Sequence, residues 1–151
     1  RVPTAVRWPG VVKPGTKITH TVSNLDWFPT ILEMAGVELP KGTTLRGRSI
    51  VPLLRGKATG WNNDFYAEYS THHQSKTHMR AYRTPRWKLI RDYRNRDRDE
   101  LYDLKKDPAE TTNLIESKDP VHRRIRILLS QRIETQMRKI NDPVLKSLAR
   151  E

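Results

Sequence analysis

The 151-residue sequence contains no cysteine. This absence excludes disulfides, thiolate metal sites and a cysteine nucleophile, and it leaves the redox compartment open. Long apolar runs are also missing, because no stretch approaches the roughly 20 residues that a membrane-spanning helix needs. We therefore expect no membrane partner. Hydrophobic residues at 35% and charged residues at 30% indicate a globular chain with much surface.

An initiator methionine and a recognisable signal segment are missing at the start, where Arg1-Val2-Pro3 leads directly into an apolar stretch. We expect the chain to be a piece of a longer protein. Its length suffices for one domain, or for one small domain and part of another.

Acidic residues are few, with 17 Asp and Glu against 29 Lys and Arg, which gives a formal charge of +12. Such a charge favours anionic partners: nucleic acid, acidic lipid, or sulfated or carboxylated polysaccharide. A solvated basic face explains the same charge equally well. Both interpretations stay open at this point.

The first part of the chain alternates turns with short structured segments. Residues 4–8 (TAVRW) are typical of a short buried strand, which Pro9-Gly10 ends. A helix is then expected in which Asp26 is the cap and Gly36 is the left-handed C-cap. One face of this helix is apolar and should pack against other residues: Phe28, Ile31, Leu32 and Ala35.

After a second short helix at residues 48–56, the pattern changes to strand periodicity. Four runs alternate apolar and polar residues: 64–70, 79–84, 86–93 and 100–104. Consecutive strands usually pair, so we predict an antiparallel meander. The mixed-charge run at 94–100 is expected to be a solvated hairpin loop.

A long helix is predicted after Asp119-Pro120, a cap followed by proline at the first helical position. Its apolar stripe is Ile125, Leu129, Ile133, Met137 and Ile140, flanked by Val121 and Leu128. Arg123, Arg124 and Arg138 form a basic opposite face, which we expect to be solvated rather than bound to nucleic acid. Asn141-Asp142-Pro143 should end the helix and leave a frayed tail. The predicted fold class is α+β.

Five phrases occur in a specific order: RVPTAVRWPGVVKPGT, SNLDWFPTILEMAG, LRGRSIVPLLRG, MRAYRTPRWKLI and ELYDLKKDPAETTNL. Together they resemble the C-terminal part of type I sulfatases, the formylglycine-dependent sulfuric-ester hydrolases of the alkaline-phosphatase superfamily. The resemblance runs from Arg1 to about Leu114, and the terminal helix fits as well. It implies that residues 1–60 complete the large α/β domain of a parent enzyme and that residues 61–151 form its C-terminal subdomain. It also implies a periplasmic or extracellular location for the parent.

The last phrase, residues 100–114, forms the final strand of the small sheet and the turn that leaves it in this family. We expect a structural role, in which Asp107-Pro108 makes a rigid turn, Glu110 and Asn113 hydrogen-bond nearby backbone, and Leu114 holds the exit. The phrase offers neither a nucleophile–base pair nor a ligand cluster.

The resemblance implies a formylglycine, made from Cys or Ser in a C/S-x-P-S-R motif, and a calcium site of acidic and amide oxygens. Neither that motif nor such a ligand set is found in the sequence. We therefore expect no catalytic residue, metal ligand or cofactor in this chain, with calcium and formylglycine in the missing N-terminal part of the parent. The chain alone should not hydrolyse sulfate esters.

The remaining candidates for chemistry lie in the segment STHHQSKTH at residues 70–78, expected as a polar connection between the first two strands. His72, His73 and Lys76 are candidate substrate-binding residues, because imidazole and ammonium donors suit a sulfated sugar and loops of this subdomain border the cleft in the family. A metal site is disfavoured, since adjacent histidines on a strand point to opposite faces. A plain surface loop is the competing interpretation, and which histidine faces the substrate is open.

Two function classes follow. The first is a C-terminal sulfatase fragment whose partner is a sulfated carbohydrate or another anionic substrate, with self-association through unpaired strand edges as an additional expectation. The second is a stand-alone basic module that binds an anionic polymer.

Overall fold

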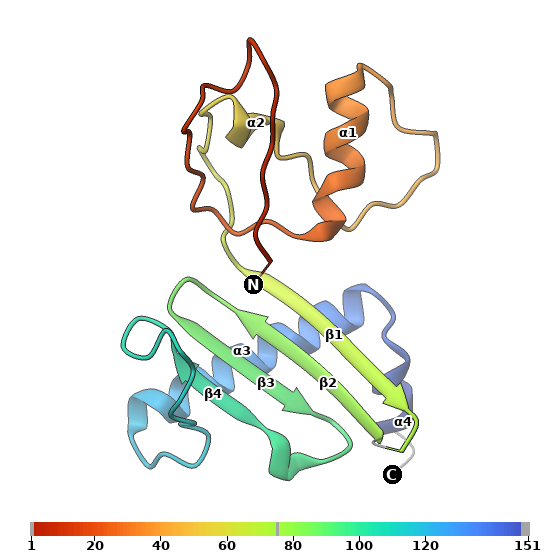
Figure 1. The fold of residues 1–151 in the computed structure, drawn as a ribbon. Coiled ribbons are helices and arrows are strands. Elements are labelled where there is room, and N and C mark those ends of the chain that lie inside the picture. The colour runs from red at the N-terminus through yellow and green to blue at the C-terminus, as the bar shows by residue number, and fades with distance from the viewer. Residues whose placement is uncertain (1, 75, 149–151) are drawn as a thin grey trace. The chain divides into compact units, whose positions relative to one another are not determined.

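The structure, a computed structural model, describes residues 2–74 and 76–148. The chain divides into two compact units, Arg1–Asn63 (unit 1) and Asp64–Glu151 (unit 2). Figure 1 shows that helices and loops make up unit 1, whereas unit 2 holds the sheet. The assignment of the first 60 residues to a large α/β domain stays a prediction.

The main helical segment of unit 1 begins with a hydrogen-bonded cap. A short 3-10 helix, η1 (Asn24–Asp26), leads into α1 (Trp27–Ala35), and α2 (Val51–Leu54) follows. Ser23 Oγ accepts a hydrogen bond from the backbone N–H of Leu25, while Asp26 accepts the N–H of Ser23 at 2.7 Å. This reciprocal arrangement is a capping box. Asp26 therefore starts the helical segment together with Ser23, and its other oxygen accepts the backbone N–H of Arg48.

The structure of unit 1 differs from two predictions. The described residues 2–63 contain no β-strand, so the strand expected at residues 4–8 is not formed. An extended segment becomes a strand only beside a hydrogen-bonding neighbour; here Val6 and Trp8 pack instead on the cluster around α2. The apolar face of α1 is not covered either: Phe28 is 52% exposed and Ile31 is 59% exposed. The residues of α1 that are buried are Pro29 and Thr30.

Unit 2 contains the predicted antiparallel meander. Its strands are β1 (Phe65–His72), β2 (Lys76–Arg83), β3 (Trp87–Asp92) and β4 (Glu100–Asp103), paired in the order β1-β2-β3-β4. Alternation along each strand separates two faces of the sheet. The face with Tyr82, Leu89 and Leu101 is the apolar one, since these residues are partners in register and are buried.

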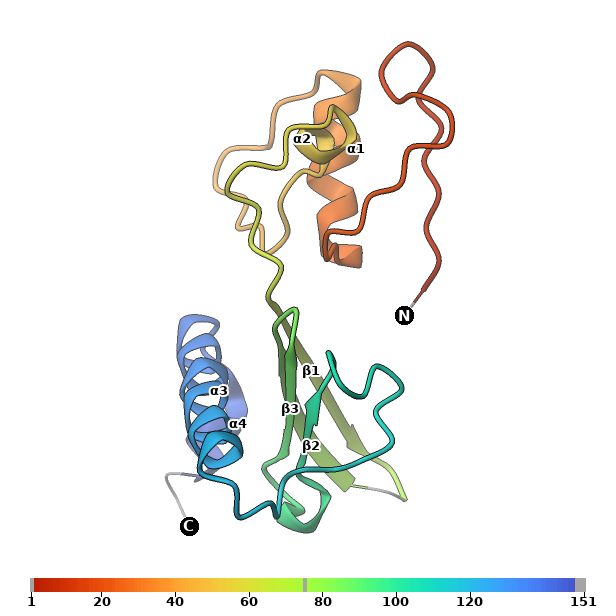
Figure 2. The same cartoon turned by 90° about the vertical axis from the view of Figure 1, so that its left-hand side faces the viewer.

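Helix α3 (Pro120–Lys139) covers this face, as Figure 2 shows. Asp119 caps it by accepting the backbone N–H of Val121. Leu129, Ile133 and Met137 are fully buried in the core with the sheet residues, which confirms the predicted stripe at its centre. The flanks differ from the prediction, because Val121 and Leu128 are exposed.

The described part of the tail that was expected to fray forms a helix instead, and residues 149–151 lie outside the described residues. Residues Pro143–Leu148 are α4. Asp142 accepts the backbone N–H of Val144 at 3.0 Å and so caps the new helix, and Val144 is buried in the core of unit 2. The proline thus begins a helix after the turn rather than only ending the previous one.

Residues 100–114 have the structural role that the sequence predicted. The Asn113 side chain accepts the N–H of Leu101 and donates to the carbonyl of Asp99, and Leu114 N–H donates to the Leu101 carbonyl at 2.8 Å. The segment therefore runs along the outer edge of β4 and protects it. Glu110 differs from expectation, since its carboxylate pairs with Lys88 across the sheet.

The charge run at 94–100 is not simply solvated. It contains a short 3-10 helix, η2 (Arg96–Arg98), and a buried carboxylate, Asp99, which accepts the N–H of Asp92 at 2.8 Å and pairs with Arg91. Asp92 is itself fully buried and accepts hydrogen bonds from Thr77, from the N–H of His78 and from the Asn95 amide. These contacts tie the hairpin end to β2.

Candidate functional site

The predicted connection at residues 70–78 is mostly strand. β1 continues to His72 and β2 begins at Lys76, so three residues separate the two strands. His72 and Lys76 are direct partners in register, and Ser70 pairs with His78. Because directly opposite residues share a face, these four side chains lie on one face at the end of the hairpin. We call them the hairpin-end cluster.

The structure separates the two neighbouring histidines. His72 is the last residue of β1 and joins the hairpin-end cluster, whereas His73 lies in the turn. Both side chains are exposed, as is Lys76. Among the three candidate residues, His72 and Lys76 are therefore brought together and His73 is not.

The second imidazole of the cluster belongs to His78, whose ring meets that of His72 edge to face with centroids 5.1 Å apart. The Nδ1 atom of His78 lies 3.2 Å from Ser70 Oγ. The pKa of His78 is lowered, first by burial, which disfavours the charged imidazolium, and then by the positive charges of His72, Arg80 and Arg94. His78 is thus held toward its neutral form.

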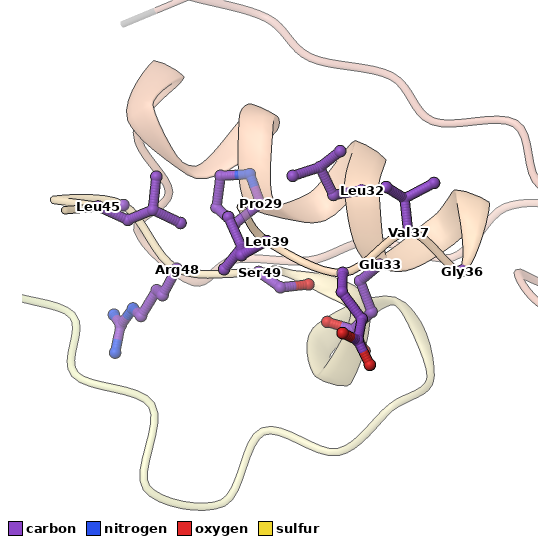
Figure 3. A pocket seen from close by; sticks show the side chains of 11 residues that line it. Pro29, Leu32, Glu33, Gly36, Val37, Leu39, Leu45, Arg48 and Ser49 are labelled. Carbon is purple, nitrogen blue, oxygen red and sulfur yellow. The ribbon is translucent and has the colours of Figure 1, made fainter. Parts of the chain in front are cut away.

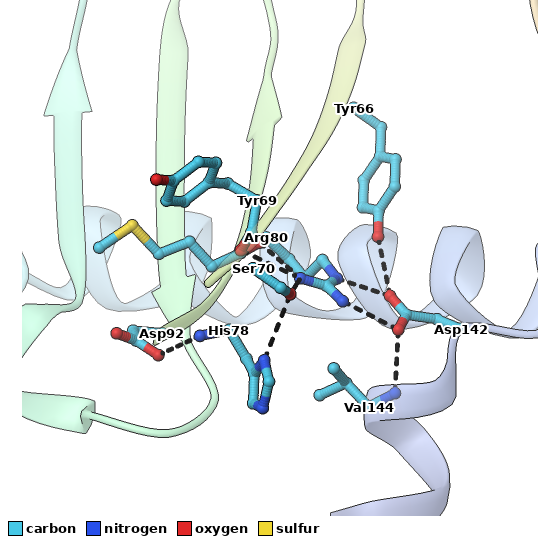
Figure 4. Close-up of polar contacts among 9 residues, drawn as sticks. Tyr66, Tyr69, Ser70, His78, Arg80, Asp92, Asp142 and Val144 are labelled. Carbon is cyan, nitrogen blue, oxygen red and sulfur yellow. Dashed lines mark hydrogen bonds and ion pairs between the residues drawn. The ribbon is translucent and has the colours of Figure 1, made fainter. Parts of the chain in front are cut away.

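A buried ion pair lies next to the hairpin-end cluster and contacts one of its residues. Arg80 donates to Asp142 through two nitrogens, with Nη2 at 2.9 Å from Oδ1, and both side chains are almost fully buried. The remaining guanidinium nitrogen donates to Ser70 Oγ at 3.1 Å and to the Met79 carbonyl at 2.7 Å. Figure 4 shows this chain of contacts from Asp142 through Arg80 and Ser70 to His78.

The charges of this pair stabilise each other. Burial raises the pKa of Asp142, but the hydrogen bonds from Arg80 and from the Val144 N–H outweigh burial, so the net pKa is lowered. Tyr66 Oη lies 3.5 Å from the same carboxylate, and burial raises its pKa. Sequence reasoning missed Arg80 and His78 as members of this network and treated Asp142 only as a helix stop. The Asp142-Pro143 pair was the available signal, since it is also typical of a helix start.

A hollow of unit 1 is a different kind of surface. A pocket of about 450 Å³ lies between α1 and residues 37–49. Figure 3 shows the aliphatic side chains of Leu32, Val37 and Leu39 along it, with Glu33 at one end and Arg48 at the other. Arg48 is engaged elsewhere, since it stacks on the Trp61 ring at 3.6 Å and donates to the Asn62 carbonyl. The pocket is a mainly apolar depression without a nucleophile–base pair.

The donor set of the described residues does not fit a metal ion. No three His, Asp or Glu side chains of residues 2–74 and 76–148 come together in a group that could hold one. In the same part of the chain, no helix is both long and apolar enough to cross a membrane.

Comparison with known proteins agrees with this architecture. Residues 1–139 match the family model described as "N-sulphoglucosamine sulphohydrolase, C-terminal". The chain is 34% identical over 150 residues to an N-acetylglucosamine-6-O-sulfatase of Bacteroides thetaiotaomicron, covering 95% of this chain and 26% of that protein. It is 30% identical over 149 residues to the steryl-sulfatase of Mus musculus, covering 83% of this chain and 24% of that protein.

A solved structure is also similar. It is a protein in complex with its substrate D-glucosamine-2-N,6-O-disulfate, with 30% sequence identity and a TM-score of 0.72, covering 91% of this chain and 28% of that one. The chain therefore spans about a quarter of the length of the relatives that it matches.

Proposed function

We propose that this chain, which belongs to the family of sulfatase C-terminal domains, is the C-terminal part of an enzyme that hydrolyses sulfate esters of a saccharide or a related compound. The observation that carries the proposal is the family match over residues 1–139, which extends through both compact units. A match confined to one unit would be compatible with a domain combined with unrelated partners. The names of the relatives, an N-acetylglucosamine-6-O-sulfatase and a steryl-sulfatase, support a sulfated ligand and leave saccharide and steroid sulfates as alternatives.

The bond-breaking groups are proposed to lie in the three quarters of the relatives' length that this chain does not span. The chain has no cysteine and no C/S-x-P-S-R sequence from which a formylglycine could be made. Three of its carboxylates, Asp92, Asp103 and Asp142, are buried and accept hydrogen bonds from protein groups. Calcium and formylglycine are accordingly assigned to the rest of the enzyme, and no step of the reaction is assigned to residues of this chain.

The role proposed for unit 2 is substrate contact at the hairpin-end cluster. His72 and Lys76 are opposite each other and exposed, so an imidazole and an ammonium are available side by side. Together they can donate hydrogen bonds to a sugar hydroxyl or to a sulfate oxygen. We select His72 rather than His73, because only His72 shares a face with Lys76.

The role proposed for unit 1 is attachment to the remainder of the enzyme. Leu25 of η1 and Phe28 and Ile31 of α1 are each more than half accessible. Apolar side chains that cluster in this way on a folded unit mark a surface that is covered in the functional protein. We propose that the α/β domain of the parent covers it, which would make residues 1–60 part of that domain.

The activity can be tested on the purified whole enzyme and on the 151-residue chain. We expect the whole enzyme to release sulfate from 4-nitrophenyl sulfate and the chain alone to release none, with or without calcium. Turnover by the chain alone that survives repurification would contradict the proposal.

Substrate contact can be tested on the whole enzyme with single variants. His72→Ala should lower kcat/KM for the natural saccharide by about tenfold (about 1.4 kcal/mol of transition-state binding). His73→Ala should change it by less than about twofold. Hydrolysis of 4-nitrophenyl sulfate should be unchanged in both, because a small aryl ester does not extend to the hairpin end. Equal effects of the two variants would refute the selection of His72.

A second function, binding of an anionic polymer by the isolated chain, is favoured by the exposed basic face of α3. Arg123 and Arg124 lie there beside exposed Ile127 and Leu128. Heparin binding whose affinity falls steeply with salt would support it. Salt-insensitive or absent binding would leave this face as ordinary solvated surface.

A further inference from the structure

The four side chains of the hairpin-end cluster differ in their exposure and in their hydrogen-bond partners. His72 and Lys76 are exposed at the strand ends, whereas His78 is partly buried and bonded to Ser70. None of the four carries negative charge. The next pair on the same face is Glu68 opposite Arg80, and the Arg80 guanidinium pairs with Asp142. A site built from these groups would attract an oxyanion.

The Ser70 hydroxyl determines how His78 is oriented. A guanidinium can only donate, so Ser70 Oγ is the acceptor in its 3.1 Å contact with Arg80 Nη1. The hydroxyl keeps one proton to donate and a second lone pair with which to accept, and the Nδ1 atom of His78 lies 3.2 Å away. We take the direction in which Ser70 donates. Donation to Nδ1 makes this nitrogen the acceptor of the ring. The positive charge of Arg80 on the oxygen strengthens this donation, because hydrogen bonds in a chain polarise one another.

An acceptor Nδ1 places the ring proton on Nε2. In neutral imidazole one nitrogen donates while the other accepts, so the bond that one nitrogen makes selects the tautomer. The lowered pKa of His78 agrees with a neutral ring. His78 then has an N–H donor at Nε2, the ring atom on the side away from Ser70.

The origin of this arrangement lies outside the hairpin. Arg80 cannot turn away from Ser70 without breaking its paired contacts with Asp142, and both partners are buried. Asp142 is in turn held at the start of α4 by the N–H of Val144. The α3–α4 turn is thus connected to His78 through three successive contacts, and with Ser70 as the donor these contacts select Nε2 as the protonated nitrogen of His78.

We propose that His78, in the fixed Nε2–H tautomer, is a specificity-determining residue that binds an oxyanion of the saccharide, a sulfate or a carboxylate, together with Lys76 and His72. Lys76 supplies the charge, and the two imidazoles supply directed donors. Ser70, Arg80 and Asp142 are positioning residues that act through His78. The saccharide as ligand rests on the proposed function, whereas the tautomer and the oxyanion site do not.

The tautomer is tested on the full 151-residue chain by long-range proton–nitrogen NMR correlations of the imidazole rings. We expect His78 to show the Nε2–H pattern and to change to a mixture in Ser70→Ala. His122, which lies at the start of α3 and contacts Trp87, should keep its pattern. A His78 ring that carries its proton on Nδ1 in the unaltered chain would overturn the proposal.

The oxyanion site is tested in the same sample by titration with inorganic sulfate against chloride at constant ionic strength. Sulfate should shift the resonances of His72 and His78 in a saturable manner. His78→Asn should weaken binding by about fivefold or more. His78→Gln should weaken it by less than about twofold, because the glutamine amide reaches the Nε2 position and still donates. Lys76→Ala should weaken it strongly, and the matched surface variant Lys106→Ala should not. Equal losses in the two His78 variants would contradict a directed Nε2 donor.

The source of the oxyanion is separated by two sugar probes, glucosamine 6-sulfate and glucuronate. Saturable shifts with the first alone assign the site to a sulfate group, and shifts with the second alone assign it to a carboxylate. Shifts with neither sugar, or with chloride as strongly as with sulfate, would reject the site. Failure of the proposed function would appear differently, as the absence of sulfate-ester hydrolysis by the whole enzyme with the NMR results unchanged.

Discussion

Unit 1 and unit 2 differ in how much of their apolar surface each buries by itself. Unit 2 has a sheet with a helix across it, and its core residues Leu89, Leu101, Ile133 and Met137 are completely inaccessible. Unit 1 has a small apolar cluster around α2 but exposes Leu25 on η1 and Phe28 and Ile31 on α1. A helix with an apolar face therefore contributes to a closed core only when its own unit also supplies the surface that packs against that face. Unit 2 supplies such a surface, and the described residues of unit 1 do not.

The largest expected effect is the loss of unit 2 at low pH. Burial raises the pKa values of Asp92, Asp103 and Asp142, but hydrogen bonds, chiefly from Thr77, Arg86 and Arg80, outweigh it and lower them. A carboxyl whose pKa is depressed in the folded state stabilises that state fully above its unfolded pKa of about 3.9 and loses this contribution as the pH falls. Circular dichroism and hydrogen exchange should show unit 2 losing stability progressively below about pH 4. Constant stability between about pH 6 and pH 2 would contradict the role of these carboxylates.

Truncation in the core of unit 2 is expected next. Leu129 is 1% exposed and packs between α3 and the sheet, so Leu129→Ala should cost about 2–5 kcal/mol in the free energy of unfolding. Ile127, on the same helix but 50% exposed, provides the matched control, and Ile127→Ala should cost less than about 0.5 kcal/mol. Chemical denaturation of both variants measures the difference. Equal costs would mean that α3 is not docked on the sheet.

A smaller effect is expected where unit 1 is tightly packed. A Cβ atom at Gly47 would lie 2.0 Å from the carbonyl oxygen of Leu25, a backbone atom that cannot move without disturbing η1. Gly47→Ala should therefore destabilise unit 1 by about 1–3 kcal/mol, with Lys41→Ala as an exposed control. Hydrogen exchange at the amides of α1 and α2 should report the loss, and the amides of β2 and β3 should not. A uniform loss in both units would show that they unfold together.

The smallest effect is expected on the uncovered face of α1. Ile31→Ser in the 151-residue chain should change stability by less than about 0.5 kcal/mol, because the side chain already contacts solvent. In the whole enzyme the same change should cost about 2 kcal/mol, since the proposed α/β domain would bury this residue. The free energy of unfolding of both proteins, measured with and without the substitution, shows whether Ile31 is buried only in the whole enzyme. An identical small cost in each would refute the proposed attachment surface.

The fold of unit 2 could be predicted because its signals are local. Alternation in residues 64–70, 79–84, 86–93 and 100–104 corresponds to the four strands, and the spacing of Leu129, Ile133 and Met137 identifies the buried side of α3. The ends of the two strands within the polar segment 70–78 were harder to predict from the sequence. Ser70, His72, Lys76 and His78 share one face of the hairpin. None of them is apolar, so the period of two is hidden in the composition.

The sequence by itself determined the family resemblance, the meander, the long capped helix and the structural role of residues 100–114, because each depends on residues close together in the chain. Tertiary structure alone decided that His72 and not His73 stands opposite Lys76, that the face of α1 stays uncovered, and that Arg80 meets Asp142. The last two residues are separated by 62 positions. Such a pair has no periodic signature, and it forms only because α3 crosses the sheet and the following turn brings a carboxylate back to β2.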